Sequence, residues 1–126
     1  MQARDFFAMA LNLDDEEIIE DIVTGSSFRH VQQGEILLKE GECQQEMLFL
    51  VSGIIRLYYF DVNGQEITDC FAAEPGMPII ARPKLLVPSA VYIEASTDSD
   101  MYSIPSAHID CRWISTVNSL RYITMC

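Results

Sequence analysis

The side chains that could carry out chemistry in this sequence are few and lie far apart. Only two histidines are present, His30 and His108. A metal site of the cupin kind needs clustered histidines together with a glutamate, so a cupin-type metalloenzyme is the least favoured hypothesis. Asp61 and Glu66 flank a glycine turn and read as solvated charges without a partner for acid–base catalysis. His30 has no second histidine near it, and we interpret it as a surface or edge-strand residue.

The four cysteines, Cys43, Cys70, Cys111 and Cys126, form no C-x-x-C pair. In a chain without an export signal this predicts four reduced thiols, two of them in the core. The alternative is a redox-sensing thiol, for which Cys43 is the candidate because it lies in a polar turn beside Glu42. A negative neighbour disfavours the reactive thiolate, which weighs against this alternative.

Composition narrows the classes of protein further. The 126 residues suffice for one domain, and 49% of them are hydrophobic, which excludes disorder. Eight basic and nineteen acidic residues give a net charge of −11, which would repel a phosphate backbone. No apolar run is long enough to span a membrane, and no nucleotide-binding or nucleophile motif is present. We therefore expect one cytoplasmic domain over residues 1–126, neither an enzyme nor membrane-bound, without a cofactor, that binds no nucleic acid by itself.

The stretch from Gly34 to Gly76 consists of short apolar runs separated by glycine turns. Runs of four to eight residues rich in Ile, Leu, Val, Phe and Tyr are typical of strands and too short for helices. Asn63-Gly64 lies where a tight hairpin would reverse the chain. The sequence predicts strands from about Phe28 and at 35–39, 46–52, 54–61, 65–72, 91–95 and 101–104. A compact antiparallel β-barrel or sandwich follows.

The N-terminal segment is expected to cover this β-structure. Asp14 offers an N-cap for a helix from about Asp15 to Val23, which Gly25 ends. One face of that helix is apolar. Before it, mildly apolar residues should pack onto the barrel. They are Phe6, Phe7, Met9 and Leu11.

Several motifs carry a resemblance to a known family. They are Gly34-Glu35-Ile36-Leu37, Glu40-Gly41-Glu42, Val51-Ser52-Gly53, the strand Ile54–Phe60 with Asn63-Gly64 after it, and Glu74-Pro75-Gly76. Over about residues 15 to 115 the chain resembles the sensor domain of Crp/Fnr-type bacterial transcription regulators. The resemblance implies a mainly β fold, a double-stranded β-helix or jelly-roll barrel with short flanking helices at the N- and C-termini. It also implies a small-molecule effector.

In that family, the loop that corresponds to residues 77–90 binds a cyclic nucleotide. A Gly-Glu pair holds the ribose hydroxyl, and an Arg next to a Ser or Thr holds the phosphate. The resemblance places the Gly-Glu pair near Ile80 and Ala81 and the Arg near Ser89, so both anchors are absent. We therefore expect cyclic AMP and cyclic GMP not to bind.

The loop keeps apolar members, and its three prolines predict a largely irregular path. An effector there would gain mainly from buried apolar area, with Arg82 or Lys84 at the rim, which favours an apolar or aromatic acid. The candidate ligand-binding residues are Met77, Ile79, Ile80, Ala81, Arg82, Ser89 and Ala90. The alternatives are ordinary core packing for the apolar residues, solvated loop charges for the cations, and a structural or dimerisation module that has lost its ligand.

The C-terminal segment predicts a helix from about Ala107 with Trp113, Val117 and Leu120 on one face. Regulators of the resembled family continue into a dimer helix and a helix-turn-helix, which nothing after Arg121 supplies in full. The chain is thus expected to correspond to a sensor domain alone, with no complete DNA-binding domain, either as a natural stand-alone form or as the N-terminal piece of a longer regulator. Its apolar helical face either mediates a homodimer or folds back on the barrel.

If that face mediates a homodimer, light scattering at tens of micromolar should give a dimer mass, because soluble monomers rarely leave such a face uncovered. Trp113→Asp should then return the mass of a monomer. A monomer mass that Trp113→Asp leaves unchanged contradicts self-association through this helix.

Overall fold

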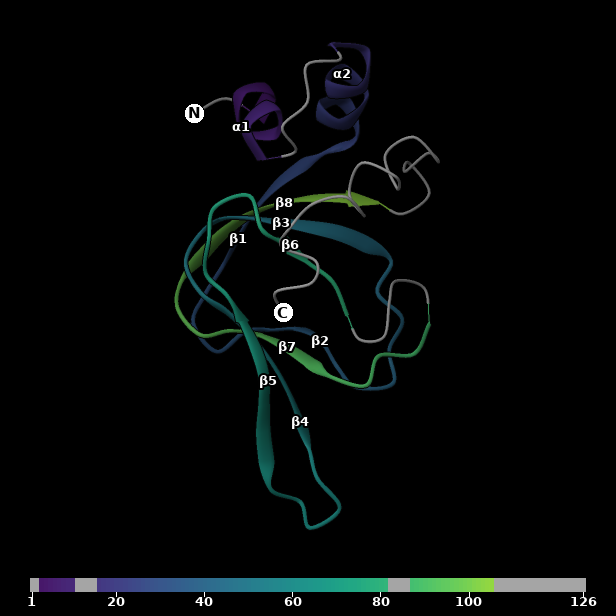
Figure 1. Ribbon diagram of the computed structural model, residues 1–126, viewed down its shortest axis with the longest axis vertical. Coiled ribbons are helices and arrows are strands. Elements are labelled where there is room, and N and C mark those ends of the chain that lie inside the picture. The colour runs from purple at the N-terminus through teal and green to yellow at the C-terminus, as the bar shows by residue number, and fades with distance from the viewer. Residues whose placement is uncertain (1–2, 11–15, 82–86, 106–126) are drawn as a thin grey trace.

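The computed structural model describes residues 3–10, 16–81 and 87–105. Within these residues, two four-stranded antiparallel sheets face each other, with strand orders β1-β8-β3-β6 and β2-β7-β4-β5 (Figure 1). The strands are β1 (Ser27–Val31), β2 (Ile36–Leu38), β3 (Glu46–Ser52), β4 (Ile55–Phe60), β5 (Glu66–Ala72), β6 (Pro78–Ile79), β7 (Tyr92–Ala95) and β8 (Ser99–Pro105). Apart from the β4–β5 hairpin, each successive strand crosses to the other sheet. The predicted jelly roll is confirmed.

Strand positions follow the apolar runs closely, with two differences. The short strand β6 lies in the segment that the prolines led us to expect to be irregular, and it pairs with Leu48 and Phe49 of β3. Its Pro78 is tolerated because β6 is an edge strand of the first sheet. Strand β8 begins at Ser99, two residues before the predicted strand 101–104, because its pairing with β1 extends to Val31.

The main core lies between the two sheets. Strand β3 contributes Leu48 and Leu50, strand β4 contributes Leu57, and β7 and β8 contribute Ile93 and Met101, all of them buried. Burial alternates along β7 and over most of β8, which is the pattern of strands with one face inward.

Two helices cover the outer face of the first sheet, α1 (Ala3–Ala10) and α2 (Glu16–Gly25) (Figure 1). Phe6 and Phe7 are buried in a second apolar cluster with Phe49 of β3 and Ile104 of β8, as the sequence predicts for the two N-terminal phenylalanines. Met9 is instead 54% exposed, so its expected packing is wrong. Helix α1 was not predicted, and it turns Met9 away from the sheet. Leu11 lies outside the described residues.

Helix α2 agrees with the prediction for residues 15–23 and ends at Gly25. It buries Ile18, Ile19 and Ile22, which are part of its apolar face. Its first-turn residue Glu16 and also Glu20 form ion pairs with Arg4 of α1, which fastens the two helices to each other. No described helix has the length and apolar character that crossing a membrane requires.

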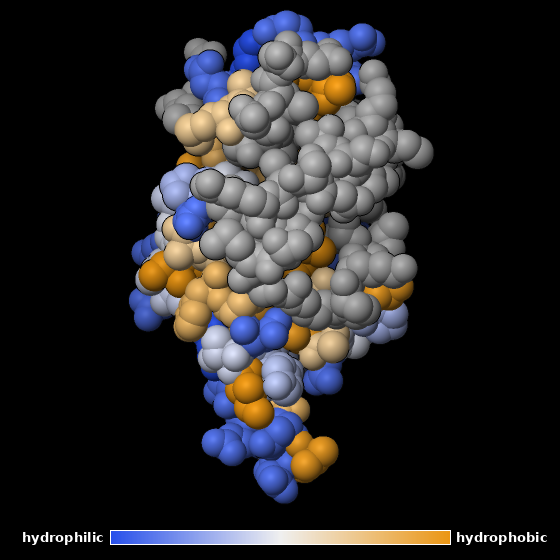
Figure 2. Space-filling view, in the orientation of Figure 1, coloured by the Kyte–Doolittle hydropathy of each residue, from blue (hydrophilic) through white to orange (hydrophobic). Residues whose placement is uncertain are grey.

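The β4–β5 hairpin projects from the body of the barrel (Figure 1), with apolar and polar side chains mixed along it (Figure 2). At its tip, one carboxylate oxygen of Asp61 accepts the N–H groups of Asn63 and Gln65, both at 2.9 Å. Gly64 has a φ of +80°, as expected for Asn63-Gly64 at a chain reversal. Asp61 therefore stabilises the turn.

His30 lies on the edge strand β1, as predicted. Its Nδ1 is 2.6 Å from a carboxylate oxygen of Asp100, which is also its cross-strand partner on β8. The hydrogen bond to Asp100 is the main reason that the pKa of His30 lies above its ordinary value. His108 lies outside the described residues.

The expectation of four reduced thiols is wrong. Cys70 of β5 is disulfide-bonded, so it is not a free thiol. Cys43 is free and exposed, as its polar turn suggests. Cys111 and Cys126 lie outside the described residues. Spacing between cysteines along the chain could not reveal the bond, because it does not show which segments lie close together in the fold.

The turn between β3 and β4 depends on Gly53. Its φ is +100°, and a Cβ added there would lie 2.8 Å from the carbonyl oxygen of Asp98 and would overlap the hydroxyl of Ser99. We expect Gly53→Ala to lower the free energy of unfolding by about 2–4 kcal/mol, from left-handed strain plus the clash. Urea denaturation measures this. The matched control is Gly64→Ala, which has open space around it; it should cost only about 1 kcal/mol. Equal losses would show that the close contact at Gly53 has no energetic weight.

Candidate functional site

The segment Met77–Ala81, where the resembled family places its Gly-Glu pair, runs along the core. Met77, Ile79 and Ala81 are buried between the two sheets. Ile80 points the other way and packs against the cluster under the helices. The apolar residues predicted as a pocket floor are thus divided between the two sides of the segment.

The buried side chain of Gln44 holds this segment in place. Its amide nitrogen donates to the carbonyl oxygen of Ile79 at 2.9 Å and to that of Glu46 at 2.7 Å. Its amide oxygen accepts the N–H of Ala81 at 2.6 Å. Ile79 and Ala81 both lie in the core, so few other partners could satisfy their backbone groups. Sequence reasoning missed this residue.

Ser89, the position of the family's phosphate-binding Arg, is buried, and its hydroxyl is used locally. The hydroxyl donates to the carbonyl oxygen of Val91 at 2.7 Å and accepts the N–H of the same residue at 3.1 Å. The backbone of Ser89 pairs with the opposite turn, through Gly41 N–H at 2.7 Å and the Glu42 carbonyl at 2.9 Å. Ala90 is exposed beside it. Arg82 lies outside the described residues, as does Lys84.

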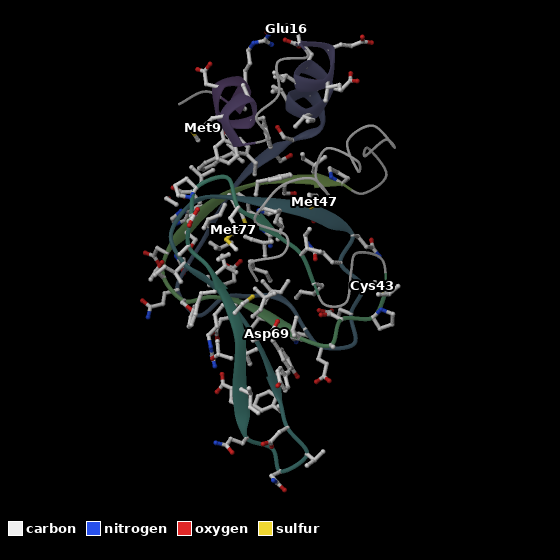
Figure 3. All side chains as sticks on the ribbon, viewed as in Figure 1. Met9, Glu16, Cys43, Met47, Asp69 and Met77 are labelled. Atoms are coloured by element: carbon white, nitrogen blue, oxygen red, sulfur yellow. The ribbon has the colours of Figure 1, made fainter. Side chains whose placement is uncertain are left out.

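A cavity of about 260 Å³ lies beside the turn formed by residues 42–45. Aliphatic side chains of β2, β3 and β7 line it together with the polar turn 42–45, which includes Cys43. Figure 3 places Cys43 at the outer edge of the molecule. None of the predicted ligand-binding residues that the structure describes lines this cavity. The run Glu42–Glu46, polar except for Cys43, was the only sequence signal for it.

The charges around the cavity are partly paired. Nη1 of Arg29 lies 3.9 Å from a carboxylate oxygen of Glu46, and the hydroxyl of Ser103 donates to that same oxygen. One carboxylate oxygen of Glu42 accepts the N–H of Lys39 at 2.8 Å. Among the described lining residues, Arg29 is thus offset by Glu46, and Glu42 leaves one net negative charge.

A separate charged cluster lies on the outer face of the second sheet. Arg56 Nη1 is 2.5 Å from Glu66 and 3.7 Å from Glu94. Its guanidinium lies 4.4 Å from the centre of the Tyr58 ring, which stacks on Tyr92. Partial burial raises the pKa of Tyr58. Glu66, expected to be a solvated charge, is therefore the partner of Arg56 in a structural ion pair.

Within the described part of the chain, no three His, Cys, Asp or Glu residues come together as metal ligands would. His108 lies outside that part, so the argument against a metalloenzyme still rests on the presence of only two histidines in the sequence.

Comparison with known proteins adds a family. Residues 28–110 match the family model described as the cyclic nucleotide-binding domain. Patatin-like phospholipase domain-containing protein 7 of Rattus norvegicus is 31% identical to the chain over 100 residues. That match covers 78% of the chain but only 7% of the rat protein.

Two solved structures share the fold. The catabolite activator protein of Thermus thermophilus has a TM-score of 0.67 and 20% identity, covering 92% of this chain and 53% of that one. The N-terminal domain of a transcriptional regulator from Streptomyces coelicolor A3(2) has a TM-score of 0.70 and 17% identity, covering 99% of this chain and 89% of that one.

The buried amide of Gln44 generates a prediction. Gln44→Ala leaves the N–H of Ala81 without its acceptor and the carbonyl of Ile79 without this donor, and we expect a loss of about 2–4 kcal/mol in the free energy of unfolding. The neighbouring exposed residue supplies the control, because Gln45→Ala should change that free energy by less than about 0.5 kcal/mol. Urea denaturation of both variants tests the difference, and similar values for the two would refute the structural role of Gln44.

Proposed function

Because the chain belongs to the cyclic nucleotide-binding domain family, we propose that it is the effector-sensing domain of a Crp/Fnr-like transcription regulator whose effector is not cyclic AMP. The likeness to the Streptomyces coelicolor domain, which comes from a transcriptional regulator, supports this proposal. The fold serves sensing and regulation, so we assign no catalytic role. The phospholipase relative does not change this, since the chain spans so little of it.

The observation that carries the proposal is the chemistry of the two anchor positions. The segments 77–81 and 87–91 contain no charged residue. Ala81 offers only a backbone N–H, which Gln44 already accepts, and the Ser89 hydroxyl is bonded to Val91. A ribose would find no carboxylate there, and a cyclic phosphate would find no guanidinium.

The expected free energy of binding also disfavours a cyclic nucleotide. Hydrogen bonds to charged groups contribute about 1.5–3 kcal/mol each, and a cyclic nucleotide would lose several of them here. At the two anchor positions the phosphate would also be desolvated without a charged partner, in a chain of net charge −11.

The effector that suits the remaining residues is largely apolar. An apolar or aromatic acid would combine burial against Met77 and Ile79 with a charge contact from Arg82 at the rim. The net negative charge of the chain acts weakly against this, since surface charges are screened beyond about 8–10 Å. In this proposal the domain works in the cytoplasm, in a homodimer formed through Trp113, Val117 and Leu120.

A second function is favoured by one observation, the tight packing of Met77, Ile79 and Ala81 in the core. If these residues never separate from their core neighbours to admit a ligand, the domain is a structural or dimerisation module without an effector. Any coding sequence that follows Cys126 would discriminate, because a helix-turn-helix there supports the regulator.

Calorimetric titration with cyclic AMP and cyclic GMP tests the central claim, and we expect no binding at micromolar concentration. A thermal-shift screen should then find stabilisation by aromatic acids and none by nucleotides. Arg82→Ala should remove the acid's effect, with Asp61→Asn on the distant hairpin as the control variant. Micromolar affinity for either cyclic nucleotide would overturn the proposal, and an acid's affinity that survives Arg82→Ala would overturn the assigned contact.

A further inference from the structure

The cavity at the turn 42–45 has the features of a second binding site. From its lining we infer that it binds a small organic ammonium ion with an apolar body, such as a primary amine on a single ring or a short chain. Among the described residues, the site shares none with the segments assigned to the effector, so it can be tested separately from the proposed function.

The floor of the cavity is aliphatic. Ile93 of β7 and Leu48 of β3 are buried, while Leu37 and Leu38 of β2 are partly buried and pack against the same core. A volume of about 260 Å³ lies just below the range of about 300–1,000 Å³ for sites that take drug-sized ligands. The occupant must therefore be small, and an apolar body would contact these aliphatic side chains.

The rim determines the sign of the ligand's charge. The charge of Arg29 is offset by Glu46, 3.9 Å away, which also accepts the hydroxyl of Ser103, so this pair adds no net charge to the rim. Glu42 is different, because Lys39 N–H occupies one carboxylate oxygen and the other has no hydrogen-bond partner among the described residues. An ammonium group can donate to that oxygen while its apolar part lies on the floor.

The electrostatic field of the whole chain also favours a cationic ligand. A net charge of −11 raises the local concentration of cations near the surface and lowers that of anions. The rim also includes the exposed side chain of Gln45, whose amide oxygen adds an uncharged acceptor.

A ligand in this cavity would also act on the core. Gln44 lines the cavity and at the same time bonds to Ile79 and Ala81. A ligand that contacts Gln44 therefore contacts the residue that positions the segment Met77–Ala81.

Titration of the complete ¹⁵N-labelled chain with benzylamine at pH 7, where it is an ammonium ion, tests the inference. Amide shifts should saturate and concentrate in residues 37–48 and at Ile93. Benzyl alcohol has the same ring without the charge and should bind at least threefold more weakly, while benzoate should cause no saturable shift there. Glu42→Gln keeps an acceptor for Lys39 N–H but removes the charge, and it should weaken benzylamine at least threefold. Glu66→Gln, on the distant hairpin, should leave the affinity unchanged.

The inference is wrong if benzylamine shifts do not saturate, if they map away from the cavity, or if benzoate binds these residues as well as benzylamine does. It is also wrong if Glu42→Gln and Glu66→Gln weaken binding equally, because that result would reflect the general negative charge of the chain.

Discussion

The burial of strand β3 on both faces is the constraint on which the layers of this molecule depend. Leu48 and Leu50 point between the sheets, while Met47 and Phe49 point outward under the helices. An outward face this apolar cannot be left in water, so the first sheet needs the cover that Phe6 and Phe7 provide. The second sheet has no such strand, and its outer face carries the ion pairs of Arg56.

Much of the fold could be predicted because its signals are local. Apolar runs between glycines located β3, β4 and β5 to within a residue or so, and the capping pattern located α2. What failed was set by contacts distant in the sequence. Strand β6 exists because β3 offers it an edge, and β8 starts early because β1 extends its ladder. Helix α1 was missed because its apolar residues predict contact with the barrel without predicting a helix.

The candidate site was predictable only where a residue type is decisive. The lack of a carboxylate near Ile80 and of a guanidinium near Ser89 could be read from the sequence, since no packing can create those groups. The role of Gln44 could not, because Gln44 and Gln45 are identical in type and only the fold decides which of them is buried. The cavity beside them was hidden for the same reason, since its walls come from four strands that are separated in the chain.

The pairing of β1 with β8 has a consequence for how the protein is made. Ser27 of β1 pairs with Ser103 of β8 in this ladder. Strand β1 therefore cannot form this ladder until β8, the last described strand, has been synthesised. The loop that this contact closes spans most of the domain, and non-local closure of this kind slows folding. During synthesis the β4–β5 hairpin can form early, but the first sheet stays open until Pro105 has left the ribosome. Until then, Met47 and Phe49 on β3 have incomplete cover, and a chaperone that shields apolar strands would act in this interval.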